Sequence, residues 1–261
     1  MDLNLKGKRA LVCGSTQGIG KASAVELALL GASITLMARD ESKLKSVLNE
    51  LSREAGQSHD YLVADFAFPD QVKNKVEEYI AKSGIQILVN NTGGPPAGRA
   101  IDALPEDFKH AFASHLICNQ ILVQAVAPAM RREKYGRIIN IISTSVKIPI
   151  AGLGVSNTIR GAVASWSKTL SLELAIDGIT VNNILPGSTK TGRMDAIIQS
   201  RVQKTGRSAD NIRNEMTAEI PAGRMAEASE IAAVVAFLAT PAAGYINGVN
   251  LAVDGGRTGS L

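Results

Sequence analysis

The chain has 261 residues, of which 45% are hydrophobic and only 4% aromatic, with a formal net charge of +4. This length suits one large α/β domain whose core is built from Ala, Val, Ile and Leu. The Lys and Arg residues form no basic stripe with a docking motif, and no apolar run approaches the ~18 residues of a membrane span, so neither nucleic-acid nor membrane partners are expected. The mild positive balance suits an anionic ligand such as a phosphorylated cofactor.

The two cysteines, Cys13 and Cys118, lie outside any CxxC motif or Cys/His cluster. They are expected to be small buried residues in a reducing compartment, with no metal site. The first residues contain no basic segment followed by an apolar stretch, so no signal peptide is predicted. A cytoplasmic protein is the expectation.

Short apolar runs alternate with longer helical patterns along the chain. In order, the predicted elements are a strand at 9–13, a glycine-rich turn and a helix, a strand at 33–37, a helix at 41–55, a strand at 61–64, a helix at 71–82, a strand at 85–89, a helix at about 105–131, a strand at 137–142, a helix from about 156, and strands at 180–185 and 249–253. Such alternation predicts right-handed βαβ units and a doubly wound parallel sheet with helices on both faces, a single Rossmann-type domain spanning 1–261.

The segment at about 187–223 interrupts this alternation. It is polar and rich in Arg, Thr and Ser. A long insertion of this kind is usually functional or disordered. We interpret it as a substrate lid with one or two helices, and an inert loop is the alternative.

The turn after the first strand has the composition of a phosphate-binding loop. Glycines let the backbone approach a pyrophosphate closely, and the following helix offers free N–H groups at its positive end. A turn that needs glycines for packing alone is the other interpretation. The predicted cofactor-binding residues here are Gly14, Ser15, Thr16, Gln17, Gly18, Ile19 and Gly20.

The end of the second strand bears on the choice of cofactor. An acidic residue there would bind the ribose 2′-hydroxyl of NAD, whereas a basic residue accommodates the 2′-phosphate of NADP. The strand ends in Ala38-Arg39, and Arg39 can form a bidentate contact with phosphate. Asp40 comes one residue later and could instead cap the next helix. NADP(H) is therefore predicted in preference to NAD(H).

With these motifs in place, nearly the whole chain resembles the short-chain dehydrogenase/reductase family, especially a β-ketoacyl carrier-protein reductase-like subgroup with an incomplete catalytic tetrad. Gly14, Gly18 and Gly20 match its glycine motif, Asp65 its adenine-contacting Asp, Asn90-Asn91-Thr92-Gly93 its NNAG motif with Thr92 for Ala, and Pro186-Gly187-Ser188-Thr189-Lys190-Thr191 its PGxxxT segment beside the nicotinamide amide. The resemblance implies that Asp65, Asn91, Gly93, Pro186, Gly187, Thr189 and Thr191 bind the cofactor. It also implies a homotetramer or homodimer with interfaces on the two long central helices.

The catalytic positions depart from the family pattern. In the family a Tyr hydroxyl exchanges the proton, a Lys four residues later lowers the pKa of that Tyr and holds the nicotinamide ribose, a Ser polarises the carbonyl, and an Asn anchors a water. Ser143 matches the Ser, but the Tyr and Lys positions hold Ser156 and Arg160, and His115 stands where the Asn belongs. We expect these four residues to form the catalytic site.

The chemistry of these replacements differs. A Ser hydroxyl is a far weaker acid than a phenol, and a guanidinium keeps its proton, so Arg160 can hold ribose hydroxyls without exchanging protons. His115 has the pKa of a natural proton donor and could form a Ser-His proton path, or it could be structural. Lys147 could reach the site or lie in solvent. Gly94-Pro95-Pro96 could form a rigid wall of the substrate mouth or a surface loop.

Three functions are consistent with the sequence. The first is an NADP(H)-dependent oxidoreductase, similar to 3-oxoacyl-(acyl-carrier-protein) reductases, with a non-standard proton donor and a small carbonyl or alcohol substrate, such as an acyl thioester. The second is an NADP(H)-binding sensor or scaffold without redox turnover, since Tyr and Lys are missing together. The third is dehydration or isomerisation that uses His115.

Overall fold

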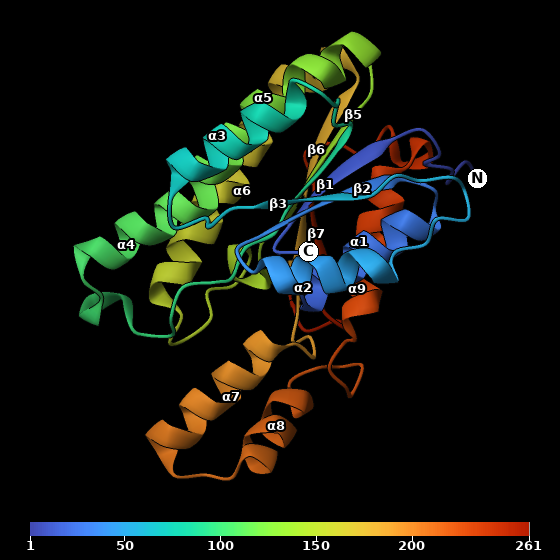
Figure 1. Ribbon diagram of the computed structural model, residues 1–261. Coiled ribbons are helices and arrows are strands. Elements are labelled where there is room, and N and C mark those ends of the chain that lie inside the picture. Colours follow the sequence, from blue (N-terminus) through green and yellow to red (C-terminus); the bar gives the residue numbers. More distant parts are fainter. Residues whose placement is uncertain (261) are drawn as a thin grey trace.

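A parallel β-sheet lies between two layers of helices in the computed structural model, which describes residues 1–260 (Figure 1). Its strand order is β3-β2-β1-β4-β5-β6-β7. The strands are β1 (Arg9–Cys13), β2 (Ser33–Ala38), β3 (Asp60–Val63), β4 (Ile87–Asn90), β5 (Gly136–Ile141), β6 (Ile179–Pro186) and β7 (Asn250–Val253). The prediction of a doubly wound parallel sheet is confirmed.

Helices connect these strands, and two consecutive helices form a hairpin beside the sheet. They are α1 (Gly18–Leu29), α2 (Glu41–Glu50), α3 (Pro69–Ile80), α4 (Pro105–Phe112), α5 (Cys118–Glu133), α6 (Gly154–Leu174), α7 (Gly192–Thr205), α8 (Ala209–Ala218) and α9 (Ala228–Ala239). A π-helical segment joins α4 to α5 (Ala113–Ile117), and short 3-10 turns lie at Ala100–Asp102, Thr144–Val146, Ala175–Asp177 and Pro241–Ala243. None of the helices among residues 1–260 is long and apolar enough to cross a membrane.

Burial on both faces explains why the central strands are continuous apolar runs. In β1, Val12 pairs with Leu36 of β2 and with Val89 of β4, and all three side chains are fully buried. Side chains alternate between the two faces of a strand, so a strand covered by helices on both sides must be apolar throughout. This composition fits the position of β1 as an interior strand between β2 and β4.

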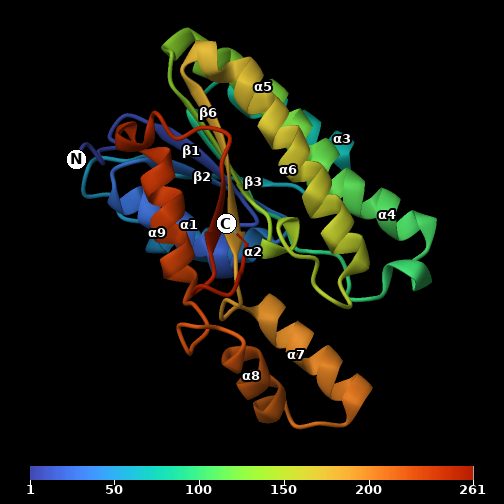
Figure 2. The ribbon, with the colours of Figure 1, turned by 180° about the vertical axis from the view of Figure 1, so that it is seen from behind.

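Two apolar cores lie between the sheet and the helices that cover it. One core joins the sheet to α1, α2 and α9, and the other joins it to α3, α5 and α6. Figure 2 shows the same two layers from behind, with α9 and α1 on one side and α5 and α6 on the other. The helices α7 and α8 project below the sheet, and a small apolar cluster of their own holds them together.

Several elements differ from the sequence expectations. Helix α2 ends at Glu50, before the predicted limit, and α6 begins at Gly154. The predicted long helix at 105–131 is interrupted by the π-helical segment, which contains His115. Helix α9 was not predicted, because residues 231–239 are all apolar and show no helical alternation with polar positions.

Candidate active site

A cavity of about 950 Å³ opens at the carboxyl ends of the central strands. From β1 the chain continues to β2 and β3 on one side of β1, and it then crosses to β4 on the other side, so the direction of strand addition reverses between β1 and β4. Ligands of doubly wound sheets bind in the crevice at such a switch point. Of the predicted site residues, the cavity is lined by Gly14, Thr16, Gln17, Gly18, Ile19, Arg39, Asp65, Asn91, Gly93, Ser143, Ser156, Arg160, Pro186, Gly187, Thr189 and Thr191.

The glycine turn at one end is shaped for close approach of a ligand. Gly14 and Gly18 have φ of +57° and +54°, the left-handed region that glycine adopts without strain. A Cβ on Gly20 would lie 2.2 Å from the Gly14 carbonyl oxygen, so the turn cannot carry a side chain there. Helix α1 has no side-chain N-cap and no acid in its first turn, which leaves its N–H groups for an anion. These features fit a dinucleotide pyrophosphate.

Two predicted members of this turn do not line the cavity. Ser15 is fully buried, and its hydroxyl accepts a hydrogen bond from the Met37 N–H at 3.1 Å. It therefore fixes the turn to β2. Gly20 packs against the backbone of Gly14 and the Asn91 amide, so its role is close packing. Both residues thus lie in the protein interior, away from the cavity wall, and their role in binding the cofactor stays a prediction.

The end of the cavity beside β2 carries charged side chains of both signs: Lys43 is paired with Asp40 at 3.3 Å, and Arg39 forms no ion pair within residues 1–260. Arg39 is exposed on the cavity wall, and Lys43, which the sequence reasoning missed, lies beside it. Asp40 caps α2: its carboxylate accepts hydrogen bonds from the Lys43 N–H at 3.1 Å and the Ser42 hydroxyl at 2.8 Å. These contacts, led by the Lys43 N–H, lower the pKa of Asp40 to about 2. With Asp40 engaged in capping, Arg39 is placed to meet a 2′-phosphate.

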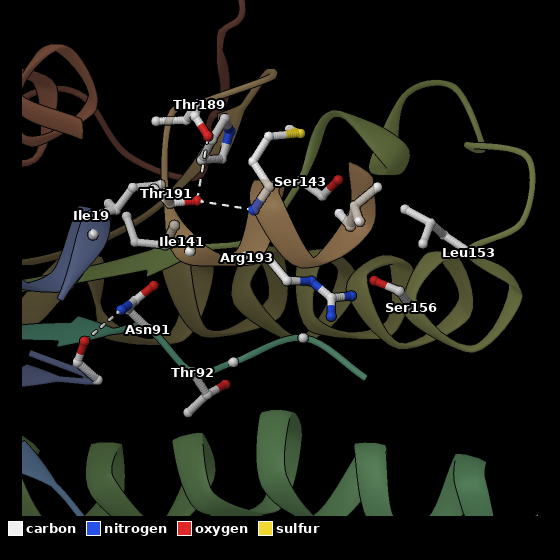
Figure 3. Close-up of a pocket in the computed structure, with 18 of the residues that line it drawn as sticks. Ile19, Asn91, Thr92, Ile141, Ser143, Leu153, Ser156, Thr189, Thr191 and Arg193 are labelled. Atoms are coloured by element: carbon white, nitrogen blue, oxygen red, sulfur yellow. Dashed lines mark hydrogen bonds between the residues drawn. The ribbon is translucent and has the colours of Figure 1, made fainter. Parts of the chain in front are cut away.

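The walls between the two ends come from β3, β4 and β6. The Asn91 side chain donates hydrogen bonds to the carbonyls of Cys13 at 3.2 Å and Gly14 at 3.3 Å, and so ties the end of β4 to the glycine turn. The Thr191 hydroxyl donates to the Thr189 carbonyl at 3.3 Å and accepts from the Met194 N–H at 3.4 Å, which starts α7 (Figure 3). Asn91 and Thr191 thus shape the cavity through hydrogen bonds to the backbone around them.

Ser143 and Ser156 both line the other end of the cavity (Figure 3). Ser143 follows β5, and its hydroxyl accepts a hydrogen bond from the Ser145 N–H at 3.1 Å, which begins a 3-10 turn. Ser156 lies in the first turn of α6 and is buried. Residues 13 positions apart thus line one cavity, because the end of β5 and the start of α6 both border it.

Arg160 lies one helical turn beyond Ser156 and is buried. Its Nη1 donates a hydrogen bond to the Ile141 carbonyl at 3.2 Å. Burial, and secondarily the charge of Arg193, lower the pKa of Arg160 to about 10, so the guanidinium stays charged at neutral pH. A fixed positive charge therefore stands beside the two hydroxyls.

His115 does not line the cavity, in contrast to the expected contact with the serines. It is 3% exposed, and its Nδ1 lies 2.5 Å from the hydroxyl oxygen of Thr92, a residue that does line the cavity. Burial, reinforced by Arg160 and Arg193, lowers the pKa of His115 to about 3. The imidazole is therefore neutral at neutral pH, and it contacts Thr92 and the Gly93 backbone, both of which line the cavity.

Sequence reasoning also missed Arg193, in the first turn of α7. Its Nη2 donates a hydrogen bond to the Pro95 carbonyl at 2.6 Å, which connects the segment at about 187–223 to the Gly94-Pro95-Pro96 loop. The signal in the sequence was a basic residue two positions after Thr191, where the helix dipole disfavours a cation. Among residues 1–260, Lys147 and Pro96 are not part of the cavity wall.

The fold and the cavity define a dinucleotide-binding α/β protein with a polar site beside the cofactor crevice. The chain belongs to the short-chain dehydrogenase/reductase family, in its ketoacyl reductase-like subgroup: the family model described as enoyl-(acyl carrier protein) reductase matches residues 14–258. It is 32% identical to a 3-oxoacyl-(acyl-carrier-protein) reductase of Vibrio cholerae over 97% of this chain and 98% of the relative.

Two further relatives agree in length and fold. An NADPH-dependent reductase of Bacillus subtilis is 29% identical over 97% of this chain and 99% of its own. The crystal structure of L-sorbose reductase from Gluconobacter frateurii, complexed with NADPH and L-sorbose, superposes with a TM-score of 0.93 and 30% identity, covering 100% of both chains.

Proposed function

We propose that the protein is an NADP(H)-dependent reductase of a carbonyl compound, similar to 3-oxoacyl-(acyl-carrier-protein) reductases, whose proton donor is not a tyrosine. The observation that carries this proposal is a single cavity that joins the glycine turn and Arg39 to Ser143, Ser156 and Arg160. The relatives that are NADPH-dependent, or that hold NADPH, support the cofactor assignment.

The residues of the cavity can account for binding and orientation of the cofactor. The α1 N-terminus would hold the pyrophosphate, Arg39 and Lys43 the 2′-phosphate, and Arg160 a ribose hydroxyl. Thr189 and Thr191 would lie along the nicotinamide side of the crevice. When bound, NADPH supplies a hydride to the carbonyl carbon.

The side chains at the serine end would then interact with the carbonyl oxygen of the substrate. The hydroxyls of Ser143 and Ser156 can donate hydrogen bonds to it, and the Arg160 charge stabilises the negative charge that develops on it. The oxygen must gain one proton to give the alcohol. Ser156 can pass its own proton only if a second group replaces it, because a Ser hydroxyl is a weak acid. A proton from solvent must therefore restore the Ser156 hydroxyl, and the Thr92 hydroxyl, which is hydrogen-bonded to His115, is the group that we propose carries it.

NADPH absorbance during incubation with 3-oxoacyl thioesters and simple ketones tests this function. We expect oxidation of NADPH, and Ser156→Ala is expected to lower kcat at least about ten-fold with little change in NADPH affinity. NADPH binding measured by calorimetry without any turnover across these substrates would favour the alternative, a binding protein that acts as a sensor or scaffold. The neutral, enclosed state of His115 gives no support to dehydration or isomerisation by that residue.

A further inference from the structure

The serine end of the cavity carries two guanidinium groups without a carboxylate beside them. Arg160 donates to the Ile141 carbonyl, and Arg193 donates to the Pro95 carbonyl, so both described contacts are to neutral oxygens. Neither side chain forms an ion pair within residues 1–260. The acid on the facing wall, Glu219, is already paired with Arg257. The site thus holds unneutralised positive charge.

Arg193 reaches into the site from a different element than Arg160. Its side chain extends from α7, and the guanidinium points towards Ser156 on α6 (Figure 3). A Cβ built on Gly94 would lie 3.4 Å from Nη2 of Arg193, so the guanidinium also rests against the β4 loop. The charge therefore stands at the mouth of the serine site, between three walls of the cavity.

This arrangement is unfavourable without an anion. The Arg193 charge lowers the pKa of both Arg160 and His115, which means that these groups experience one another's positive field. Arg193 also lies in the first turn of α7, where the helix dipole repels a cation. An oxyanion between the guanidiniums would reverse each of these costs, because charge-assisted bidentate contacts are strong in partly buried sites.

The phosphates of the cofactor have other partners. The glycine turn and α1 N-terminus fit the pyrophosphate, and Arg39 and Lys43 line the opposite end of the cavity. Farther along α7, Arg201 and Lys204 extend the positive wall away from the glycine turn. The charge at the serine end therefore exceeds what the cofactor would neutralise at its own binding positions.

We propose that Arg193, together with Arg160, binds an oxyanion of the substrate, so that the substrate is a short anionic carbonyl compound. The proposal deepens the proposed function, since the reacting carbonyl is the one that Ser143 and Ser156 would hold. The guanidinium points at Ser156, so the oxyanion, a carboxylate or a phosphate, lies close to that carbonyl. Leu153, Met194 and Ile197 give the same end of the cavity apolar walls for the carbon skeleton.

Calorimetric titration of the protein saturated with NADP⁺ tests the proposal, because the oxidised cofactor prevents turnover of the ketones. Two matched pairs serve as probes: acetoacetate with methyl acetoacetate, and dihydroxyacetone phosphate with dihydroxyacetone. We expect one anion to bind at least about ten-fold more tightly than its neutral partner, and the better pair distinguishes carboxylate from phosphate. Arg193→Gln should remove this preference, and Arg193→Lys should retain part of it. Arg132→Gln, an exposed change on α5, is the matched control.

Equal binding of the anionic and neutral partners, or binding of none of the four, would overturn the proposal. So would an anion preference that survives Arg193→Gln, with folding checked by circular dichroism. NADPH affinity is measured on the same variants: a ten-fold loss in Arg193→Gln, without loss of anion preference, would assign the residue to the cofactor instead. Because the titration does not require hydride transfer, absence of NADPH oxidation would count against the proposed reductase and leave this result intact.

Discussion

At the scale of single residues, charge placement distinguishes the two ends of the cavity. Asp40 is engaged in capping α2, so its carboxylate is held by backbone and side-chain donors beside the exposed Arg39. A ligand that reaches this position meets a guanidinium as its main free partner. The NADP(H) preference that we propose therefore rests on Asp40, and not Arg39, being engaged by the protein.

The Arg39→Gln variant should bind NADPH about ten-fold to a hundred-fold more weakly, since a charge-assisted bond to the 2′-phosphate is lost. NADH affinity should change less than about two-fold, because NADH lacks that phosphate. Fluorescence titration of both cofactors measures the effect, with Arg132→Gln as the surface control. Parallel losses for NADPH and NADH would contradict this account of Arg39.

Buried His115 should make the protein sensitive to acid. The pKa of His115 is about 3 in the folded protein against 6.5 for the free side chain, so the unfolded chain binds more protons between these values. Stability is full above about pH 6.5 and falls as the pH drops towards 3. At pH 5 the loss is about 2 kcal/mol.

Urea unfolding at pH 7 and pH 5 measures this loss, and His115→Asn should remove most of it. Both proteins retain His59, whose pKa is also lowered, chiefly by burial, so the difference between them isolates His115. The same pH dependence in both would show that His115 titrates normally in the folded chain.

At the scale of elements, side-chain amides form a ladder across the sheet. Asn90, Asn140, Asn183 and Asn250 occupy one register on β4, β5, β6 and β7. The amide nitrogens of Asn90, Asn140 and Asn183 each donate a hydrogen bond to the Oδ1 of the next asparagine in this order, at 2.8–2.9 Å. The ladder pairs these amide nitrogens inside the sheet, while the buried Oδ1 of Asn90 has no hydrogen-bond partner within residues 1–260. It also aligns the strands that end at the cavity.

Asn140→Leu should destabilise the protein by about 3 kcal/mol, because the amides of Asn90 and Asn183 would each lose a buried partner. Asn250→Ala, at the exposed end of the same ladder, should cost less than about 1 kcal/mol. Thermal and urea unfolding of the two variants provide the comparison. Similar losses at both positions would mean that the ladder acts as isolated pairs.

At the scale of the whole molecule, apolar side chains at the end of α6 remain exposed in the single chain. Leu172 is 71% exposed, and Ile176, in the following 3-10 turn, is 86% exposed. Family resemblance assigns oligomer contacts to the two long central helices, and a homotetramer or homodimer through α5 and α6 is the assembly that we propose.

The double variant Leu172→Glu, Ile176→Glu should therefore lower the oligomeric mass, since each glutamate would introduce a charge into an apolar contact. Light scattering coupled to size-exclusion chromatography measures the mass. Leu29→Glu, at a 61% exposed site on α1, is the matched control and should leave it unchanged. An unaltered mass in the double variant would place the contact elsewhere.

Most of the sheet and half of the site could be predicted from the sequence, because the signals were local. Buried parallel strands must be apolar runs, and a glycine turn before a helix has a recognisable composition. Helix α9 was not predicted, because the nine residues at 231–239 are all apolar and show no helical periodicity. Arg193 was not predicted as a site residue, because the Pro95 carbonyl to which it donates a hydrogen bond is 98 residues away in the chain. A contact between residues so far apart in the chain produces no recognisable spacing of residue types in the sequence.

The sequence by itself determined the alternating fold, the glycine turn, and the presence of serine and arginine at positions 156 and 160. Only the tertiary structure decided that Ser15, Gly20 and His115 face inward, while Arg193 faces the cavity. The reason is physical: backbone pattern and residue type follow from neighbours along the chain, whereas burial, charge pairing and pKa depend on which distant elements pack around a side chain.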